Sequence, residues 1–167
     1  MLGTGFQHTG CYFNPSGGLN SQMENFVKEL QVRWSDLDPN VHLRHSVYYD
    51  WGAYSRILFF NENKLTTIVL QQLQIGPILF REECVFKREI RLGDRVTIDL
   101  RLLKARKDYS RWAIQHSIVK NDDTLSAILT VEGAWLDIAK RKLAIPPPEV
   151  SSVLAAMPKD GSFEWME

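Results

Sequence analysis

The hydrophobic pattern of the chain changes from the period of a strand to that of a helix early in the sequence. Leu30, Val32 and Trp34 alternate with polar neighbours, which predicts a half-buried strand. A turn-rich run follows, and Pro39 in it has no amide donor. Ser46 is a residue type that caps helices, and the helical pattern after it runs to about residue 63. One side of this helix carries Val47, Trp51, Tyr54, Ser55, Leu58, Phe59 and Glu62, a broad face that predicts burial in the core.

The remainder of the sequence has the alternation of an antiparallel sheet. A short amphipathic segment at 66–73 precedes four expected strands, at about 78–89, 94–104, 110–120 and 125–139. Turn-forming residues separate the strands, and the prolines at 146–148 end the sheet region. The order of one strand, a long buried helix and a meander predicts an α+β domain at 23–148 with about five strands. A short helix and tail are expected at 149–167.

The first 22 residues differ from the rest of the sequence. Residues 1–22 carry no Asp, Glu, Lys or Arg and are rich in Gly, Asn and Ser. They lack the basic start and the apolar stretch of a secretory signal. We therefore expect a poorly ordered N-terminal extension, followed by one domain, as the length of 167 residues also suggests.

Charge and cysteine content exclude several classes of function. The 20 Lys and Arg residues balance 20 Asp and Glu residues, so the basic excess of a nucleic-acid-binding protein is missing. No apolar run approaches the roughly 18 residues of a membrane-spanning helix, and we expect no membrane partner. Cys11 and Cys84 fit neither a disulfide framework nor a zinc spacing, which favours a cytoplasmic location. The glycine and serine motifs of serine hydrolases, nucleotide hydrolases and dinucleotide-binding proteins are absent.

The densest polar cluster lies at 35–45, between the first strand and the long helix. It contains Asp36, Asp38, Asn40, His42 and His45. The free amides at a helix N-terminus can hold a developing oxyanion, and an acid just upstream would face the other side of a bound carbonyl. The cluster therefore favours attack on an acyl group. Two alternatives stay open: the acids only cap the turn, or the acids and histidines bind a metal.

The run at 33–48, R-W-S-D-L-D-P-N-V-H-L-R-H-S-V-Y, resembles the signature of the hotdog-fold thioesterases. The run at 86–94, F-K-R-E-I-R-L-G-D, is also similar, and the likeness extends over about 27–148. The resemblance implies a single hotdog domain whose antiparallel sheet wraps a long central helix. It also implies hydrolysis of an acyl-CoA or acyl-carrier-protein thioester without a metal or organic cofactor, in a homodimer or homotetramer with sites between subunits.

The resemblance also suggests roles for individual residues. In the 4-hydroxybenzoyl-CoA thioesterase type, the second Asp of the turn is the catalytic carboxylate, and it matches Asp38. This residue would act as the nucleophile or as the base for water. The backbone amides near His45 and Ser46 would polarise the thioester carbonyl.

A second set of roles comes from the acyl-acyl-carrier-protein thioesterases. Their catalytic group matches Asp38, Asn40 and His42, and alignment on the Gly-Asp pair at 93–94 adds Glu89. The chain departs from the family at three places: Val41 replaces a common Gly, Arg44-His45 replaces a polar pair, and Ala53 replaces an acid in the helix. The last difference leaves Asp38 as the main acid.

A basic group flanks one of the expected strand turns. It consists of Lys104, Arg106, Lys107 and Arg111. These cations are either a binding site for the phosphates of CoA or a solvated hairpin tip.

Two other functions are compatible with the same fold. One is a hotdog enoyl-CoA hydratase, although Pro39 stands before Asn40 and His42 comes one residue early for the hydratase spacing. The other is a non-catalytic module that binds an acyl thioester.

Overall fold

A computed structural model describes residues 25–167, and the predicted extension at 1–22 lies outside the described residues. Its helices are η1 (Trp34–Asp36), α1 (His45–Glu62), α2 (Thr67–Gln72) and α3 (Pro148–Ala155). Its strands are β1 (Val27–Leu30), β2 (Ile75–Phe86), β3 (Val96–Asp99), β4 (Arg101–Arg106), β5 (Arg111–Lys120), β6 (Thr124–Asp137), β7 (Lys142–Ala144) and β8 (Lys159–Met166). No helix in this part of the chain is long and apolar enough to cross a membrane.

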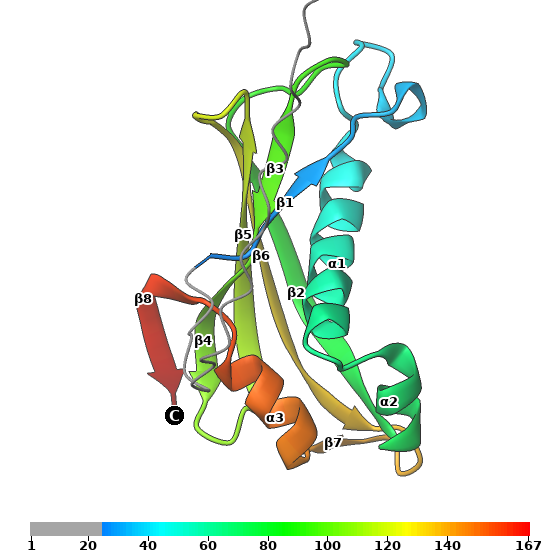
Figure 1. The fold of residues 1–167 in the computed structure, drawn as a ribbon, viewed down its shortest axis with the longest axis vertical. Helices are drawn as coiled ribbons and strands as arrows, with labels where there is room; N and C mark the ends of the chain where they lie inside the picture. Colours follow the sequence, from blue (N-terminus) through cyan, green and yellow to red (C-terminus); the bar gives the residue numbers. More distant parts are fainter. Residues whose placement is uncertain (1–24) are drawn as a thin grey trace, which may run out of the picture.

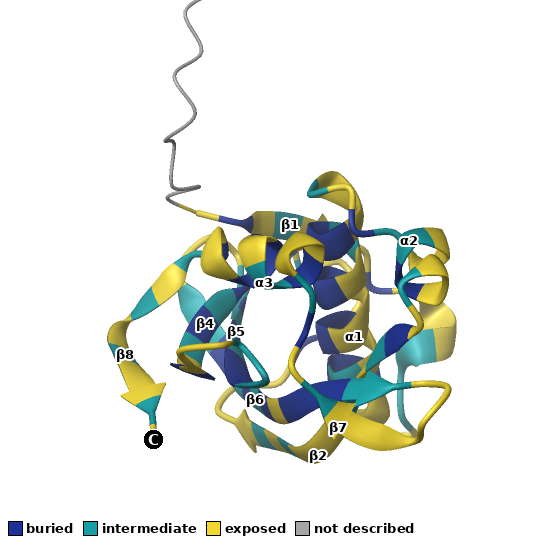
Figure 2. Cartoon of the chain, turned by 90° about the horizontal axis from the view of Figure 1, so that it is seen from below, coloured by how far each residue is buried: buried dark blue, intermediate teal, exposed yellow. Residues whose placement is uncertain are grey.

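The curved sheet wraps around α1, as the sequence predicts (Figures 1 and 2). Strand β5 lies at the centre of the sheet and pairs with β3, β4 and β6. Strand β1 extends the sheet beside β3, β8 extends it beside β4, and β2 pairs with β6. Within the described chain β2 has no second neighbour, so a strand of 12 residues forms one edge of the sheet.

The expected number of strands is wrong, because the sheet has eight strands rather than about five. The strand expected at 94–104 is divided into β3 and β4 at Leu100, whose amide donates to the carbonyl of Phe26 (3.2 Å). An irregularity in the pairing of β4 between Leu102 and Lys104 bends the second half away. The expected tail contains β8, which pairs with β4 in parallel.

The expected start of the long helix is also corrected. Arg44, not Ser46, is the N-cap residue, and its side chain makes no capping hydrogen bond. The Arg44 amide instead donates to the carbonyl of Asp36 (2.9 Å), so the preceding turn determines where α1 begins. Two expected apolar positions are exposed: Trp34 lies in η1 with 81% of its surface accessible, and Tyr54 is 53% accessible.

Two hydrophobic clusters fill the space between α1 and the sheet. We call the first the upper cluster; it includes Leu43, Val47, Tyr48, Trp51, Ile90, Ile98 and Ile118. The second, the lower cluster, includes Phe59, Phe60, Trp112, Trp135, Val150 and Leu154, the last two of which come from α3. Each fully buried large apolar side chain contributes about 1.5–3 kcal/mol. The upper cluster lies under the turn that carries the candidate chemistry.

Candidate active site

Asp38 is held in a tight turn directly before α1. Its Oδ1 accepts hydrogen bonds from the amides of Asn40 (2.8 Å) and His42 (3.0 Å). The Asp38 amide in turn donates to the carbonyl of His42 (2.8 Å). Among the hydrogen bonds of the described chain, none involves Oδ2. The turn therefore fixes one carboxylate oxygen and leaves the other available to a water molecule or a substrate.

The turn also keeps Asp38 ionised. The hydrogen bond from the His42 amide is the main cause that lowers the pKa of Asp38 below its ordinary value of 3.8, and the Asn40 amide contributes in the same direction. These bonds stabilise the carboxylate form because an N–H donor binds a charged oxygen more strongly than the oxygen of a protonated carboxyl group. At neutral pH the side chain is therefore a base.

The predicted acids and imidazoles meet in one open groove of about 390 Å³. Asp38, His42, His45 and Glu89 all line it, although Glu89 is distant from the others in sequence. The remaining lining residues are Leu43, Tyr48, Phe86, Lys87 and Arg88. Asn40 and Ser46 are each close in sequence to lining residues, but neither of them lines the groove. The groove thus unites most of the site residues expected from the sequence.

Glu89 is positioned by its backbone. The Lys120 ammonium donates to the Glu89 carbonyl (2.5 Å) and also lies 3.5 Å from the carboxylate of Asp94. The pKa of Glu89 is lowered first by its own backbone amide and then by the charges of Arg91 and Lys120. The charge of His42 adds a smaller lowering of the pKa of both Glu89 and Asp38, and all three side chains line the groove.

Sequence reasoning missed Tyr48 as a lining residue of the groove. Its ring is 3% exposed and packs edge-on against Phe86, with ring centroids 5.0 Å apart. Burial raises the pKa of Tyr48 to about 12, and nearby Cys84 and Glu89 add to the effect. Tyr48 is therefore a neutral phenol at the base of the groove. The sequence did contain one sign of this role, because Tyr48 is the last residue of the run at 33–48 that resembles the thioesterase signature.

The first turn of α1 lies at the same end of the molecule as the groove. The amides of His45 and Ser46 belong to the first helical turn, where geometry leaves an N–H without an intrahelical acceptor. These amides and the helix dipole favour negative charge at this position. The Val47 amide, one residue later, is already used by the carbonyl of Arg44 (3.1 Å).

Val41 occupies a strained position in the turn that holds Asp38. Its φ angle is 63°, in the left-handed region that disfavours β-branched residues. Its amide donates to the Asp38 carbonyl (2.9 Å), so the strained residue closes the turn around Asp38. A left-handed φ angle is one that Gly adopts without strain, and Gly is the residue that the resemblance leads us to expect at this position.

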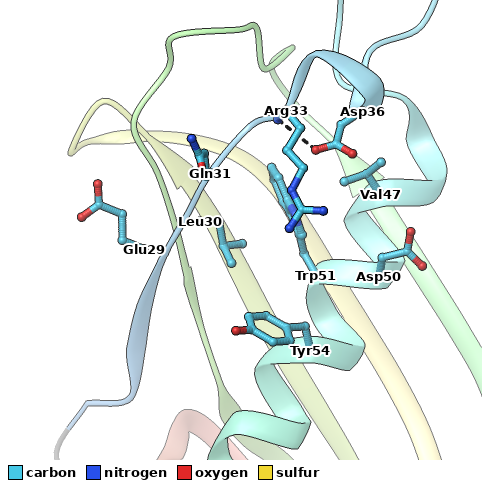
Figure 3. A pocket seen from close by; sticks show the side chains of 9 residues that line it. All are labelled: Glu29, Leu30, Gln31, Arg33, Asp36, Val47, Asp50, Trp51 and Tyr54. Atoms are coloured by element: carbon cyan, nitrogen blue, oxygen red, sulfur yellow. Dashed lines mark hydrogen bonds between the residues drawn. The ribbon is translucent and has the colours of Figure 1, made fainter.

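The two acids of the Asp-Leu-Asp run point to different places. Asp36 accepts a hydrogen bond from the Arg33 amide (2.9 Å) and lines a separate hollow of about 430 Å³. Figure 3 shows this hollow between β1 and α1, with the Arg33 side chain extending toward Trp51 and Asp50. Both acids therefore cap the turn, as one alternative expected, but only Asp38 also lines the groove.

The predicted basic group does not join these residues within one chain. Lys104, Arg106, Lys107 and Arg111 lie around the β4–β5 turn, at the lower end of Figure 1, whereas the turn at 33–44 lies at the upper end. Two members already have partners: Lys104 pairs with Glu164 (3.1 Å), and Arg106 donates to the Glu167 carbonyl (3.2 Å). Arg111 stacks on the ring of Phe80.

The metal alternative finds no support in the geometry of the described chain. Across residues 25–167, no group of three or more His, Cys, Asp and Glu side chains is arranged to hold an ion.

Comparison with known proteins assigns the family. The model of the thioesterase-like superfamily matches residues 32–154, most of the chain. The chain belongs to this superfamily. A search of curated proteins gives no match.

Solved structures confirm the hotdog fold. A Staphylococcus aureus protein in complex with CoA is 21% identical, with a TM-score of 0.74 over 86% of this chain and 88% of its own. A 1,4-dihydroxy-2-naphthoyl-CoA thioesterase from Synechocystis is 16% identical, with a TM-score of 0.70 over 78% of this chain and 96% of its own. A DHNA-CoA thioesterase from Staphylococcus aureus is 13% identical, with a TM-score of 0.70 over 78% and 89%. At these identities the likeness establishes the fold.

Proposed function

We propose that this protein is an acyl-CoA thioesterase, which hydrolyses an acyl-CoA thioester to a free acid and a thiol. The observation that carries the proposal is the Asp38 carboxylate, held by two amides with one oxygen free, in the groove at the start of α1. Membership of the thioesterase-like superfamily and the CoA complex of a structural neighbour support the same substrate class.

The reaction needs only groups that the chain supplies. Oδ2 of Asp38 accepts a proton from a water molecule while the oxygen of that water molecule attacks the thioester carbonyl. The amides of His45 and Ser46 hold the oxyanion of the tetrahedral intermediate. The C–S bond then breaks, and the thiolate takes up the proton as it leaves. Each oxyanion donor is worth about 10²–10³ in rate, so no cofactor is needed to explain turnover.

The proposal includes a second copy of the chain. The free edge of β2 carries Leu79, Phe80, Val85 and Phe86, each between 45% and 52% exposed. A long apolar edge strand is a template for pairing with another chain. A homodimer formed along β2 would cover these side chains and place the partner next to Phe86, at the wall of the groove. The site would then lie between subunits.

A substrate panel tests the activity. Release of free thiol is measured for acyl-CoA and acyl-carrier-protein substrates of several chain lengths, together with hydration of an enoyl-CoA. We expect thiol release from at least one acyl-CoA and no hydration product. Tight binding of acyl-CoA without any thiol release would instead identify a binding module and contradict the proposal.

Solution mass tests the dimer. Val85→Lys places a charge on the β2 edge and should convert the dimer to a monomer in light scattering. Leu92→Lys is the matched control, because Leu92 is 53% exposed but lies in the turn before β3. A wild-type monomer, or an unchanged mass in Val85→Lys, would contradict pairing along this edge.

A further inference from the structure

Two neighbouring cations stand at the rim of the groove. Lys87 and Arg88 follow the end of β2 directly, are exposed, and line the groove together with Asp38 and Glu89. Their backbone is fixed, because both amides donate to the carbonyl of the buried Ser126 (2.8 and 3.1 Å). The two side chains are therefore exposed charges on an anchored segment.

These cations differ from three other basic residues at the same end of the molecule. Arg91 pairs with Glu89, Arg95 with Glu29 and Asp122, and Lys120 with Asp94. Among the ion pairs of residues 25–167, none includes Lys87 or Arg88. The guanidinium of Arg88 donates only to the Lys87 carbonyl (2.7 Å) in this part of the chain. Both side chains therefore keep N–H donors available to an anionic ligand.

A second hollow shares Lys87 and Arg88 with the groove. It has a volume of about 470 Å³ and is lined by Lys87, Arg88, Thr124 and Leu125. A molecule that reaches from Asp38 across the rim into this hollow passes both cations. Lys and Arg donors of this kind bind phosphate oxygens through charge-assisted hydrogen bonds.

We propose that Lys87 and Arg88 bind the phosphates at the nucleotide end of CoA while the thioester lies at Asp38. This inference rests on the proposed function, because it takes the acyl carbonyl to be bound beside Asp38. It transfers the phosphate role from the basic group at the β4–β5 turn to the end of β2. The hollow beside Thr124 provides room for a nucleotide, which a single phosphopantetheine phosphate on a carrier protein would not fill.

Equilibrium binding tests the inference independently of turnover. Calorimetry measures the affinity of the wild type, Lys87→Ala and Arg88→Ala for CoA, for adenosine 3′,5′-bisphosphate and for 4′-phosphopantetheine. We expect each substitution to weaken binding of CoA and of the bisphosphate about tenfold, since one charge-assisted hydrogen bond is lost. Binding of 4′-phosphopantetheine should change less, and added salt should reduce the difference between wild type and variants. Lys142→Ala, an exposed cation in β7, is the control and should bind like the wild type.

Kinetics separate this inference from the proposed function. For an acyl-CoA, the two variants should raise KM about tenfold with kcat retained; for the matching acyl-pantetheine, which has no phosphate, both constants should equal those of the wild type. Equal affinity of the variants and the wild type for CoA would overturn the inference even if hydrolysis proceeds. A loss of CoA affinity in Lys107→Ala instead would return the phosphate role to the β4–β5 turn and also overturn it. Hydrolysis of the acyl-pantetheine decides the proposed function separately.

Discussion

The guanidinium of Arg56 donates to the carboxylate of Glu82 at 3.2 Å and joins the buried side of α1 to the edge strand β2. The Arg56 side chain is 8% exposed and that of Glu82 is 23% exposed. Arg56 also approaches Nε2 of His116 (3.3 Å), whose Nδ1 lies 2.8 Å from the carbonyl of Asp99. Since that carbonyl accepts, Nδ1 carries the proton and Nε2 accepts from Arg56. A polar chain therefore crosses the core from β3 to the free edge.

Removing the carboxylate of this pair should destabilise the fold strongly. Glu82→Ala leaves the buried Arg56 charge without a counter-ion, and we expect a loss of roughly 3 kcal/mol in the free energy of unfolding. Denaturant unfolding measures it. Glu83→Ala is the control, because Glu83 pairs with Arg81 at the surface and exposed pairs contribute about 0–1 kcal/mol. Equal effects of the two substitutions would show that the Arg56–Glu82 pair is not buried in solution.

His116 should make the stability depend on pH. Burial, and then the charge of Arg56, lowers the pKa of His116 from 6.5 to about 3. The unfolded chain therefore takes up a proton below pH 6.5 while the folded chain does not. The stabilisation is complete above pH 6.5 and declines as the pH falls toward 3, by at most about 1.4 kcal/mol per pH unit.

Unfolding free energies between neutral and acidic pH check this slope. His116→Gln should be less stable than the wild type at neutral pH and should show a flatter dependence in the same range. His42→Gln keeps His116 and should retain the wild-type slope. A wild-type curve that is flat down to pH 4 would be inconsistent with a buried neutral imidazole.

Relieving the strain at Val41 should stabilise the protein. Val41→Gly removes the steric penalty of a left-handed residue, and because Val41 is 61% exposed, little packing is lost. Gly is more flexible in the unfolded chain, so the net gain should be about 1 kcal/mol. Thermal unfolding measures it. Val27→Gly, at an exposed position in β1, should have the opposite effect, and a destabilised Val41→Gly variant would argue against the left-handed turn.

Asp38→Asn should separate catalysis from folding. The Asn oxygen can still accept from the amides of Asn40 and His42, but the amide side chain cannot take a proton from water. We expect thiol release to fall at least about 10²-fold with little change in unfolding free energy. Asp36→Asn, which faces the other hollow, should stay close to the wild-type rate. In the wild type, kcat/KM should stay constant as the pH falls and should decline only when the pH is below the ordinary aspartate pKa of about 3.9.

Glu89→Gln tests the second acid of the groove. If its carboxylate takes part in the reaction, thiol release falls about tenfold or more, and we expect this result because Glu89 is ionised beside His42. A rate equal to that of the wild type would reduce Glu89 to a structural residue held by Lys120.

The parts of the fold that repeat along the chain could be predicted from the sequence. The helical spacing before residue 63 located α1, and its observed end, Glu62, agrees with that expectation. The break between β3 and β4 was not visible, since Val96, Ile98, Leu100 and Leu102 alternate without interruption. Trp34 continued the alternation of the first strand although it lies in η1, because periodicity does not show where a strand loses its neighbour.

The candidate site was predictable where its residues lie close together in sequence. Asp38, His42 and His45 come from one turn, and a single alignment point added Glu89. The phosphate role of the basic group at the β4–β5 turn stays a prediction, because a local run of cations does not reveal which end of a strand faces the substrate. The Arg56–Glu82–His116 contacts join three separate elements, so no spacing along the chain could indicate them.

The two hydrophobic clusters support different parts of the domain. The turn that holds Asp38 packs on the upper cluster, whereas α3 packs on the lower cluster and β8 pairs with β4. Substitutions in the last twenty residues would thus change the thermal stability of the domain before they changed the chemistry at the groove.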